Sequence, residues 1–198
     1  MNAPDARLVL IRHGETEWSK SGQHTSRADI PLTEVGEAQA RAIGPVLADM
    51  HLRHPLVITS PRERATRTAQ LAGLVADRTW DDLVEWDYGN YEGHTTVQIR
   101  ENVPHWTVWS HPCPGGESME AVQSRADTVL SVVTPQLTDR DVVLVGHGHF
   151  SRVLIARWAD LPVVEGRRFA MSPGSITTLG YEHGVPQVVT LNECRGNA

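Results

Sequence analysis

Cysteine, lysine and long apolar runs are all scarce in this sequence, and each scarcity excludes a class of protein. The 198 residues include two cysteines, Cys113 and Cys194, which lie far apart in the chain and form no CxxC pair. Neither a disulfide framework nor a zinc site is therefore expected. No apolar run exceeds four residues, whereas a membrane-spanning helix needs roughly 20. The opening segment MNAPDARL lacks the apolar stretch of a signal peptide, so we expect a cytoplasmic protein that does not bind membranes.

Charge is modest, and basic residues are the minority. The chain has 18 lysines and arginines against 24 acidic residues, which gives a formal net charge of −6 at pH 7. This balance argues against a general affinity for nucleic acids or anionic surfaces. Every one of the 18 except Lys20 is an arginine. Codon bias explains this simply, although the same residues supply planar guanidinium groups that bind oxyanions. We expect no nucleic-acid partner, and we expect any binding of anions to be local.

What the sequence does have is the composition and the patterning of a globular α/β protein. Hydrophobic residues make up 40% and charged residues 21% of the chain, which are ordinary values for a folded domain. Short apolar segments followed by polar residues predict buried strands, and two further segments on either side of His183-Gly184 predict a closing hairpin. The expected strands cover residues 7–11, 56–59, 141–145, 175–180 and 185–191.

Helices are predicted between these strands by apolar residues at helical spacing and by capping residues. Thr33 and Ser118 are suitable N-caps, and Ser60 with Glu63 has the spacing of a capping box with Pro61 at the first helical position. The expected helices cover about 34–50, 61–74, 119–134 and 150–159, with a short one at about 96–103.

Strands that alternate with helices predict one α/β domain over residues 1–198. We expect a three-layer α/β/α sandwich in which helices flank a mostly parallel central sheet. Residues 80–116 are richer in Gly, Pro, Trp and His than the rest of the chain. They are expected to form an inserted lid-like segment of helix and loop that borders a pocket.

Polar side chains follow three of the predicted strands at their carboxyl ends. Arg12 and His13 follow the first strand, Arg62 and Arg64 lie beyond the second, and His147 and His149 follow the third. Because ligands of open α/β sheets bind outside these strand ends, the groups are expected to converge on one crevice. Arginines hold phosphate oxygens bidentately, and an unprotonated imidazole can attack phosphorus as a nucleophile. These residues therefore favour a site for a phosphoryl group.

Each of these signals also has a purely structural interpretation. His147 alone is typical of a helix cap or a core histidine, the arginines of residues 62–67 are typical of a solvated helix face, and Glu85 can be a loop carboxylate. His147-Gly148-His149 raises the hypothesis of a metal site, but the sequence has no HExxH motif and no cysteine cluster to support it. The order of the segments along the chain is needed to decide between the structural and the functional interpretation.

The chemistry-bearing segments occur in one characteristic order. They are LIRHGETEW (10–18), LTEVGEAQA (32–40), SPRERATRTA (60–69), EWDYGNYEG (85–93), PGGES (114–118) and VGHG (145–148). In this order they resemble the histidine phosphatase superfamily, which includes cofactor-dependent phosphoglycerate mutases and many acid phosphatases. The resemblance runs along the whole chain, and it places the ligand arginine of the third segment on Arg64 and not on Arg62.

The resemblance implies a mechanism for the phosphoryl site. His13 would attack phosphorus in line to form a phosphohistidine that water then hydrolyses, and Glu85 would donate and later accept a proton. Arg12, Arg64 and His147 would surround the transferred group and stabilise its charge. His147 would work best protonated and His13 unprotonated, with an acidic to near-neutral optimum. The resemblance implies neither a metal ion nor a cofactor.

Residues around this core distinguish phosphatases from mutases. Ser19 and His149 stand where mutases commonly carry Asn, and Thr96 stands where a phosphoglycerate-binding Lys is expected. The sequence is therefore closest to the mutase-like acid phosphatases, and we expect hydrolysis of small phosphate monoesters. The alternatives are a cofactor-dependent phosphoglycerate mutase, a fructose-2,6-bisphosphatase-like enzyme and, from another class, a non-catalytic phosphate-binding module.

The substrate pocket is expected in the loops that this family varies. The residues expected to bind the substrate are Ser19, Gln23, Thr25, Tyr88, Gly148 and His149, with Glu15, His24 and Trp109 as further candidates. Outside the core arginines and His147 the sequence shows no second basic cluster, so one phosphate is favoured over two. Relatives commonly dimerise, so the resemblance makes a homodimer possible.

Overall fold

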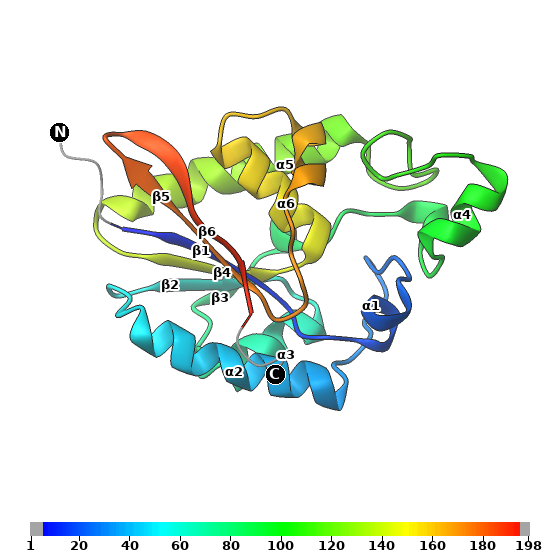
Figure 1. Ribbon diagram of the computed structural model, residues 1–198. Helices are drawn as coiled ribbons and strands as arrows, with labels where there is room; N and C mark the ends of the chain where they lie inside the picture. The colour runs from blue at the N-terminus through cyan, green and yellow to red at the C-terminus, as the bar shows by residue number, and fades with distance from the viewer. Residues whose placement is uncertain (1–5, 195–198) are drawn as a thin grey trace.

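A central sheet of six strands forms the core of the computed structural model, which describes residues 6–194 (Figure 1). In spatial order the strands are β3 (Arg78–Thr79), β2 (Leu56–Thr59), β4 (Val142–Gly146), β1 (Leu8–Arg12), β5 (Ile176–Glu182) and β6 (Val185–Glu193). The first four run parallel to one another, and β5 pairs antiparallel with both β1 and β6. The predicted mostly parallel sheet with a hairpin at its edge is confirmed.

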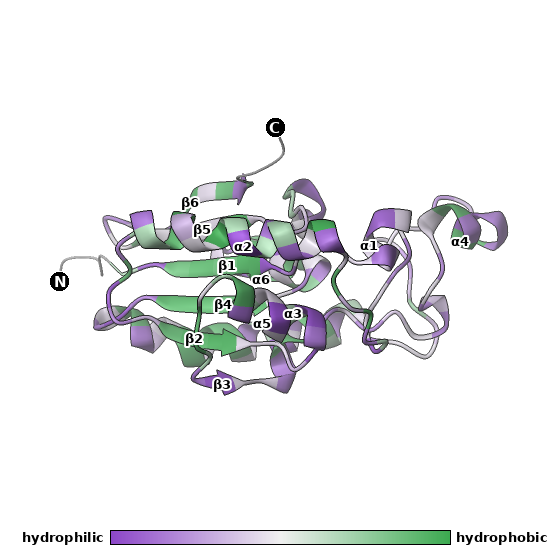
Figure 2. Cartoon of the chain, turned by 90° about the horizontal axis from the view of Figure 1, so that it is seen from below, coloured by the Kyte–Doolittle hydropathy of each residue, from purple (hydrophilic) through white to green (hydrophobic). Residues whose placement is uncertain are grey.

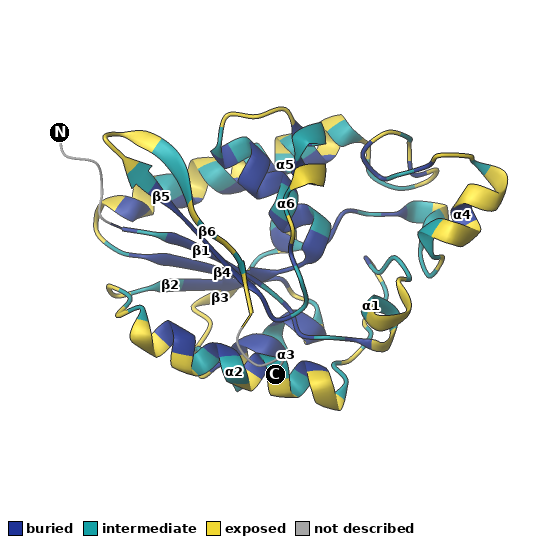
Figure 3. Cartoon of the chain, in the orientation of Figure 1, coloured by how far each residue is buried: buried dark blue, intermediate teal, exposed yellow. Residues whose placement is uncertain are grey.

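Helices cover both faces of this sheet, which explains why its central strands are apolar on both sides. Successive side chains of a strand point to opposite faces. Leu8 and Leu10 of β1 pack into the cluster that includes α5 (Met119–Val133) and α6 (Gly148–Trp158). Val9 and Ile11 pack with α2 (Glu34–Asp49) and α3 (Glu63–Leu71) on the other face. The apolar strands are buried between helices whose outer faces are exposed (Figure 2, Figure 3), so the three-layer α/β/α sandwich is confirmed.

The start of α3 differs from the prediction. The helix begins at Glu63 with Arg62 as its N-cap and has no side-chain cap, so the predicted capping box at Ser60 is wrong. The Ser60 hydroxyl lies instead 2.7 Å from Nε2 of His147. The helix also ends at Leu71 rather than near residue 74, because Gly73 adopts a left-handed conformation with φ +76°.

The irregular segment between β3 and α5 packs beside the first helix. It contains α4 (Thr96–Asn102), and Figure 1 shows α4 and α1 (Glu17–Ser21) on the same side of the molecule, beyond one end of the sheet. Backbone hydrogen bonds join the two regions, because the His24 N–H donates to the His94 carbonyl and the Gly93 N–H donates to the His24 carbonyl. The insertion therefore lies where the sequence predicts a pocket wall.

Short 3₁₀ turns complete the described elements: η1 (Asp81–Leu83), η2 (Gly89–Tyr91), η3 (Thr134–Thr138) and η4 (Val163–Arg168). Within residues 6–194, no helix combines the length and the apolar character that crossing a membrane requires.

Candidate active site

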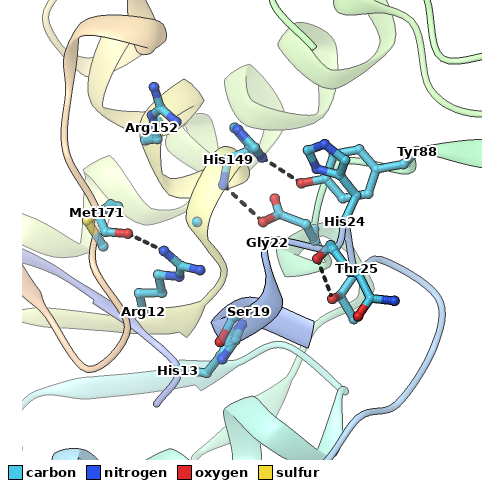
Figure 4. Close-up of a pocket in the computed structure, with 13 residues that line it drawn as sticks. Arg12, His13, Ser19, Gly22, His24, Thr25, Tyr88, His149, Arg152 and Met171 are labelled. Atoms are coloured by element: carbon cyan, nitrogen blue, oxygen red, sulfur yellow. Dashed lines mark hydrogen bonds between the residues drawn. The ribbon is translucent and has the colours of Figure 1, made fainter. Parts of the chain in front are cut away.

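The carboxyl ends of β1 and β4 border a cavity of about 170 Å³ (Figure 4). Side chains at the end of β1 and at the start of α6 meet there, together with residues from the segments that follow β1 and β3. The predicted site residues that line the cavity are Arg12, His13, Ser19, Gln23, Thr25, Glu85, Tyr88, Gly148 and His149. The crevice predicted at this edge of the sheet is therefore present.

His13 is buried at the base of the site and held in one tautomer. Its Nδ1 lies 2.7 Å from the carbonyl oxygen of Gly14. A carbonyl oxygen only accepts, so Nδ1 carries the proton, and Nε2 of the neutral ring keeps its lone pair. Burial lowers the pKa of His13 well below 6.5, and the positive charges of Arg64 and Arg12 lower it further. The ring is therefore neutral near pH 7, as a nucleophile requires.

His147 lies next to His13 and is not among the residues that line the cavity. The two ring centroids are 5.3 Å apart in an edge-to-face arrangement, and Nε2 of His147 lies 2.7 Å from the Ser60 hydroxyl. Burial, followed by Arg64, lowers the pKa of His147 well below 6.5. The sequence predicts a protonated His147, whereas within the protein alone its surroundings favour the neutral ring. A phosphate dianion beside the ring would raise that pKa again.

Arg64 is fully buried and anchored by a short turn of the chain. Its Nη1 donates to the carbonyl of Ala28 at 2.8 Å and its Nη2 to the carbonyl of Ser26 at 3.3 Å, while Asp29 lies 3.8 Å away. Glu92 holds the same turn from the other side, because its carboxylate accepts from the backbone N–H groups of Ser26 and Ala28. The guanidinium is thus fixed in position before any ligand arrives.

Arg12 approaches the site over the start of α6. Its Nη1 donates to the carbonyl of Met171 at 2.5 Å. A Cβ atom on Gly148 would lie 3.2 Å from Cζ of Arg12, so the missing side chain at 148 lets the guanidinium lie against the helix. Burial lowers the pKa of Arg12, which marks a cation taken out of water.

Polar atoms without a partner in the protein gather at this site. In residues 6–194, six buried side-chain nitrogen or oxygen atoms have no hydrogen-bond partner; three belong to neighbours of His13 and a fourth to Arg62, whose charge acts on His147. These four are Arg12 Nε, Arg62 Nε, Arg64 Nε and His147 Nδ1. Buried polar groups in folded proteins are nearly always satisfied, so a cluster of exceptions calls for an explanation. Nitrogen atoms of three arginines and a histidine are suited to an oxyanion.

Glu85 is fixed at the start of α6. Its carboxylate accepts hydrogen bonds from the backbone N–H groups of Trp86 at 2.9 Å, His149 at 2.9 Å and Phe150 at 2.7 Å. The N–H groups of a first helical turn otherwise lack partners, and the helix dipole favours a negative charge there. The sequence predicts a carboxyl group near the nucleophile, and the structure places Glu85 in the wall of the same cavity as His13.

Comparison with known proteins decides the family. Residues 8–194 match the family model described as the histidine phosphatase superfamily (branch 1). The chain belongs to the histidine phosphatase superfamily. It is 49% identical over 191 residues to a Mycobacterium tuberculosis protein named acid phosphatase, with 96% of this chain and 94% of that protein covered. It is 33% identical to a 2,3-bisphosphoglycerate-dependent phosphoglycerate mutase of Rhizobium meliloti, with 93% and 90% covered.

The fold comparison agrees with the sequence comparison. A solved structure of a Mycobacterium tuberculosis open reading frame superposes with a TM-score of 0.94 at 49% identity, covering 96% of this chain and 98% of that one. The family and the acid phosphatase relative together indicate a phosphatase, that is, a phosphoric monoester hydrolase that acts on small phosphate substrates. The resemblance stated from the sequence motifs is therefore confirmed.

The site of this histidine phosphatase also contains residues that the sequence analysis did not assign to it. Arg152, Met171 and Gly22 line the cavity, and Ser60 contacts His147. Arg152 lies three positions after His149 on α6, so helical spacing is a signal that could have found it. Met171 comes from the loop before β5, for which the sequence offers no such signal.

Two of the further pocket candidates lie elsewhere. Glu15 accepts a hydrogen bond from the Thr33 hydroxyl at 2.9 Å, and Trp109 contacts His149 edge-to-face without lining the cavity. The rings of His147 and His149 have separate partners, Ser60 and Tyr88. Within the described part of the chain, no group of three or more His, Cys, Asp or Glu side chains is arranged to hold a metal ion.

Proposed function

We propose that the chain hydrolyses small phosphate monoesters through a phosphohistidine on His13, without a metal ion. The observation that carries this proposal is the cluster of buried nitrogen atoms of Arg12, Arg64 and His147 around a neutral His13, for which residues 6–194 supply no hydrogen-bond partner. A bound phosphoryl group would supply the missing acceptors and bring phosphorus to the lone pair of Nε2. The acid phosphatase relative, 49% identical over nearly the whole chain, supports the same activity.

The proposed reaction has two displacements at phosphorus. In the first, Nε2 of His13 forms a bond to phosphorus while the ester P–O bond breaks, and Glu85 gives a proton to the leaving oxygen. In the second, water attacks the phosphohistidine, Glu85 takes a proton from that water, and inorganic phosphate leaves. The arginines stabilise the charge on the equatorial oxygens in both steps. Ser19, Gln23, Thr25, Tyr88, Gly148 and His149 line the same cavity and would contact the alcohol part.

The first test compares two matched substitutions on p-nitrophenyl phosphate. His13→Asn removes the nucleophile, and His54→Asn changes an exposed histidine of the loop before β2, where Asn tolerates the positive φ of 41°. We expect His13→Asn to lower kcat by at least about 1,000-fold, His54→Asn to leave it unchanged, and EDTA to have no effect. Hydrolysis that survives His13→Asn would contradict the nucleophile, and loss of activity with EDTA would contradict the metal-free mechanism.

A second substrate separates the proposal from its alternatives. Incubation with 3-phosphoglycerate should release inorganic phosphate without forming 2-phosphoglycerate. Formation of 2-phosphoglycerate would favour the mutase, an activity named for the Rhizobium meliloti relative. A folded wild type that binds phosphate without any turnover would favour the non-catalytic module.

A further inference from the structure

Arg152 is a cation in the cavity wall that has no acidic partner among residues 6–194. Its Nε donates to the carbonyl of Gly166 at 3.0 Å and its Nη2 to the carbonyl of Arg167 at 2.9 Å, while Nη1 makes no hydrogen bond to the described part of the chain. None of the ion pairs found within residues 6–194 includes it. Arg125 is a useful contrast, because it also lies over an aromatic ring, that of Phe150, yet pairs with Glu117 at 2.6 Å.

The residues around Arg152 fix the position of its guanidinium and partly shield it from solvent. Its Cζ lies 4.9 Å from the ring centroid of Trp109, which is itself buried. Burial lowers the pKa of Arg152, and Glu85 opposes that effect through its negative charge. A guanidinium that is desolvated, held in one orientation and not paired with a carboxylate is suited to binding an anion from outside the protein.

His149 adds a second donor one helical turn before Arg152. The Tyr88 hydroxyl lies 2.6 Å from Nδ1 of His149. Burial raises the pKa of Tyr88 well above 10, so the hydroxyl keeps its proton, and burial followed by Arg152 lowers the pKa of His149, so the ring is neutral. In the tautomer in which the Tyr88 hydroxyl donates to Nδ1, the ring proton lies on Nε2, and residues 6–194 supply no partner for it. Residues three apart on a helix share a face.

The charges of the cavity wall favour an anion at this end. Arg12 and Arg152 are its guanidinium groups and Glu85 is its carboxylate. The Glu85 oxygens already accept three backbone hydrogen bonds. Figure 4 shows Arg152 and His149 at one end of the pocket and His13 at the other, with Arg12 between them. A ligand whose phosphate lies at His13 would therefore direct its other end toward Arg152.

We propose that Arg152 and His149 form a second anion subsite, so that the preferred substrates are small phosphate monoesters whose alcohol part carries a carboxylate or a second phosphate. This inference rests on the proposed function, because it takes the His13 end of the cavity as the site of the reacting phosphate. It corrects the sequence-based view that no second basic group is available beside the first phosphate site. The cavity of about 170 Å³ limits the substrate to a short chain.

Matched pairs of substrates test the subsite in the wild-type enzyme. 3-Phosphoglycerate and glycerol 3-phosphate share one skeleton and differ in a carboxylate, while fructose 1,6-bisphosphate and fructose 6-phosphate differ in a phosphate. We expect kcat/KM to favour the member with the second anion by about 10- to 100-fold in at least one pair. The pair that shows the larger ratio identifies the anion that the subsite accepts.

Substitution of Arg152 assigns that preference to the residue. Arg152→Gln should bring the ratio within the preferred pair close to one, and Arg152→Lys should restore part of it because the positive charge returns. Arg157→Gln is the matched control, since Arg157 lies on the same helix but pairs with Asp127 at 2.7 Å. It should leave the ratio unchanged. If Arg152→Gln does not fold, the wild-type ratios and Arg152→Lys decide the question.

The outcomes separate this inference from the proposed function. Hydrolysis of p-nitrophenyl phosphate that depends on His13, together with ratios near one in both pairs, would overturn the subsite and leave the phosphatase proposal intact. If no hydrolysis depends on His13, the proposed function fails, and calorimetric binding of the same four compounds to the wild type tests the subsite alone. Tighter binding of the acidic member that is lost in Arg152→Gln would support it, and equal binding would overturn it.

Discussion

The two carboxylate oxygens of Glu85 accept hydrogen bonds from three backbone N–H groups, so the position of this side chain beside the cavity is fixed before a substrate binds. A proton donor matters most when the leaving oxygen is strongly basic, as in an alkyl phosphate, and least when it is a stabilised phenolate. We predict that Glu85→Gln lowers kcat/KM for glycerol 3-phosphate by about 100- to 10,000-fold. The loss on p-nitrophenyl phosphate should be much smaller.

The control for this prediction is Glu101→Gln, which changes an exposed carboxylate of α4 in the same way. Glutamine at 85 turns one acceptor oxygen into a donor that faces a backbone N–H, so thermal unfolding of the variant is measured beside its kinetics. Equal losses on the alkyl and the aryl substrate would show that Glu85 does not protonate the leaving group.

Single residues also show where sequence reasoning reaches its limit. His13, Arg64 and His147 could be found because strand ends and family segments fix their neighbours along the chain. Helical spacing from His149 could have pointed to Arg152, but only the folded structure shows that Arg152 lines the same cavity and has no carboxylate partner within residues 6–194. Ser60 was assigned to a helix cap by its spacing to Glu63, yet its hydroxyl lies beside His147, because tertiary packing outweighs a local capping preference.

The turn at residues 25–28 links Glu92 to Arg64. Carbonyl groups of this turn accept from the Arg64 guanidinium, and its N–H groups and the Ser26 hydroxyl donate to the Glu92 carboxylate. Glu92 is therefore a positioning residue that acts through Arg64. We predict that Glu92→Gln lowers kcat for p-nitrophenyl phosphate by about tenfold, less than direct removal of the donor in Arg64→Ala.

A double-mutant cycle tests this link. In the Arg64→Ala background, Glu92→Gln should have little further effect on kcat, because the group that Glu92 positions is gone. Losses that multiply in the double variant would mean that Glu92 acts independently of Arg64. Thermal unfolding of all variants separates either result from a loss of folded protein.

Among the helices and strands, those that could be predicted are the ones whose apolar residues recur at regular spacing along the sequence. The buried strands, the Thr33 and Ser118 caps and the closing hairpin follow from apolar spacing and turn residues, and each is present. The two-residue strand β3 was not predicted, because Arg78 and Thr79 are exposed and show no apolar pattern. Contacts between residues 23–28 and 92–95 join loops distant in sequence, and local preferences carry no information about them.

Considered as a whole, the molecule gathers two buried and two half-buried histidines in and beside one cavity, and desolvation is the largest cause of a lowered pKa in each. The pKa of His24 falls from 6.5 to about 4, and those of His13, His147 and His149 fall well below 6.5. In the unfolded chain these groups return to the ordinary value, so below about pH 6.5 the unfolded state binds protons that the folded state does not. The free energy of unfolding must therefore decrease as the pH falls below that value.

We predict that the free energy of unfolding drops by at least about 2 kcal/mol between about pH 6.5 and 5, since each such histidine contributes up to about 1.4 kcal/mol per pH unit. Urea unfolding at a series of pH values measures this. Saturating inorganic phosphate should reduce the drop, because an anion next to His147 favours its protonated form. Asp141 does not account for the effect, since its pKa is lowered from 3.8 and its contribution is lost only at lower pH.

His24→Asn isolates one of the four groups. His24 packs against Tyr88 with tilted rings whose centroids are 4.6 Å apart, and it takes no step in the proposed reaction. Its removal should lessen the pH slope between about pH 6.5 and 5 by up to about 1.4 kcal/mol per pH unit, while His54→Asn, on the exposed loop before β2, should not. A slope that His24→Asn leaves unchanged would mean that this ring gains a proton as readily in the folded state as in the unfolded one, and the wall of the cavity would then carry positive charge in acid.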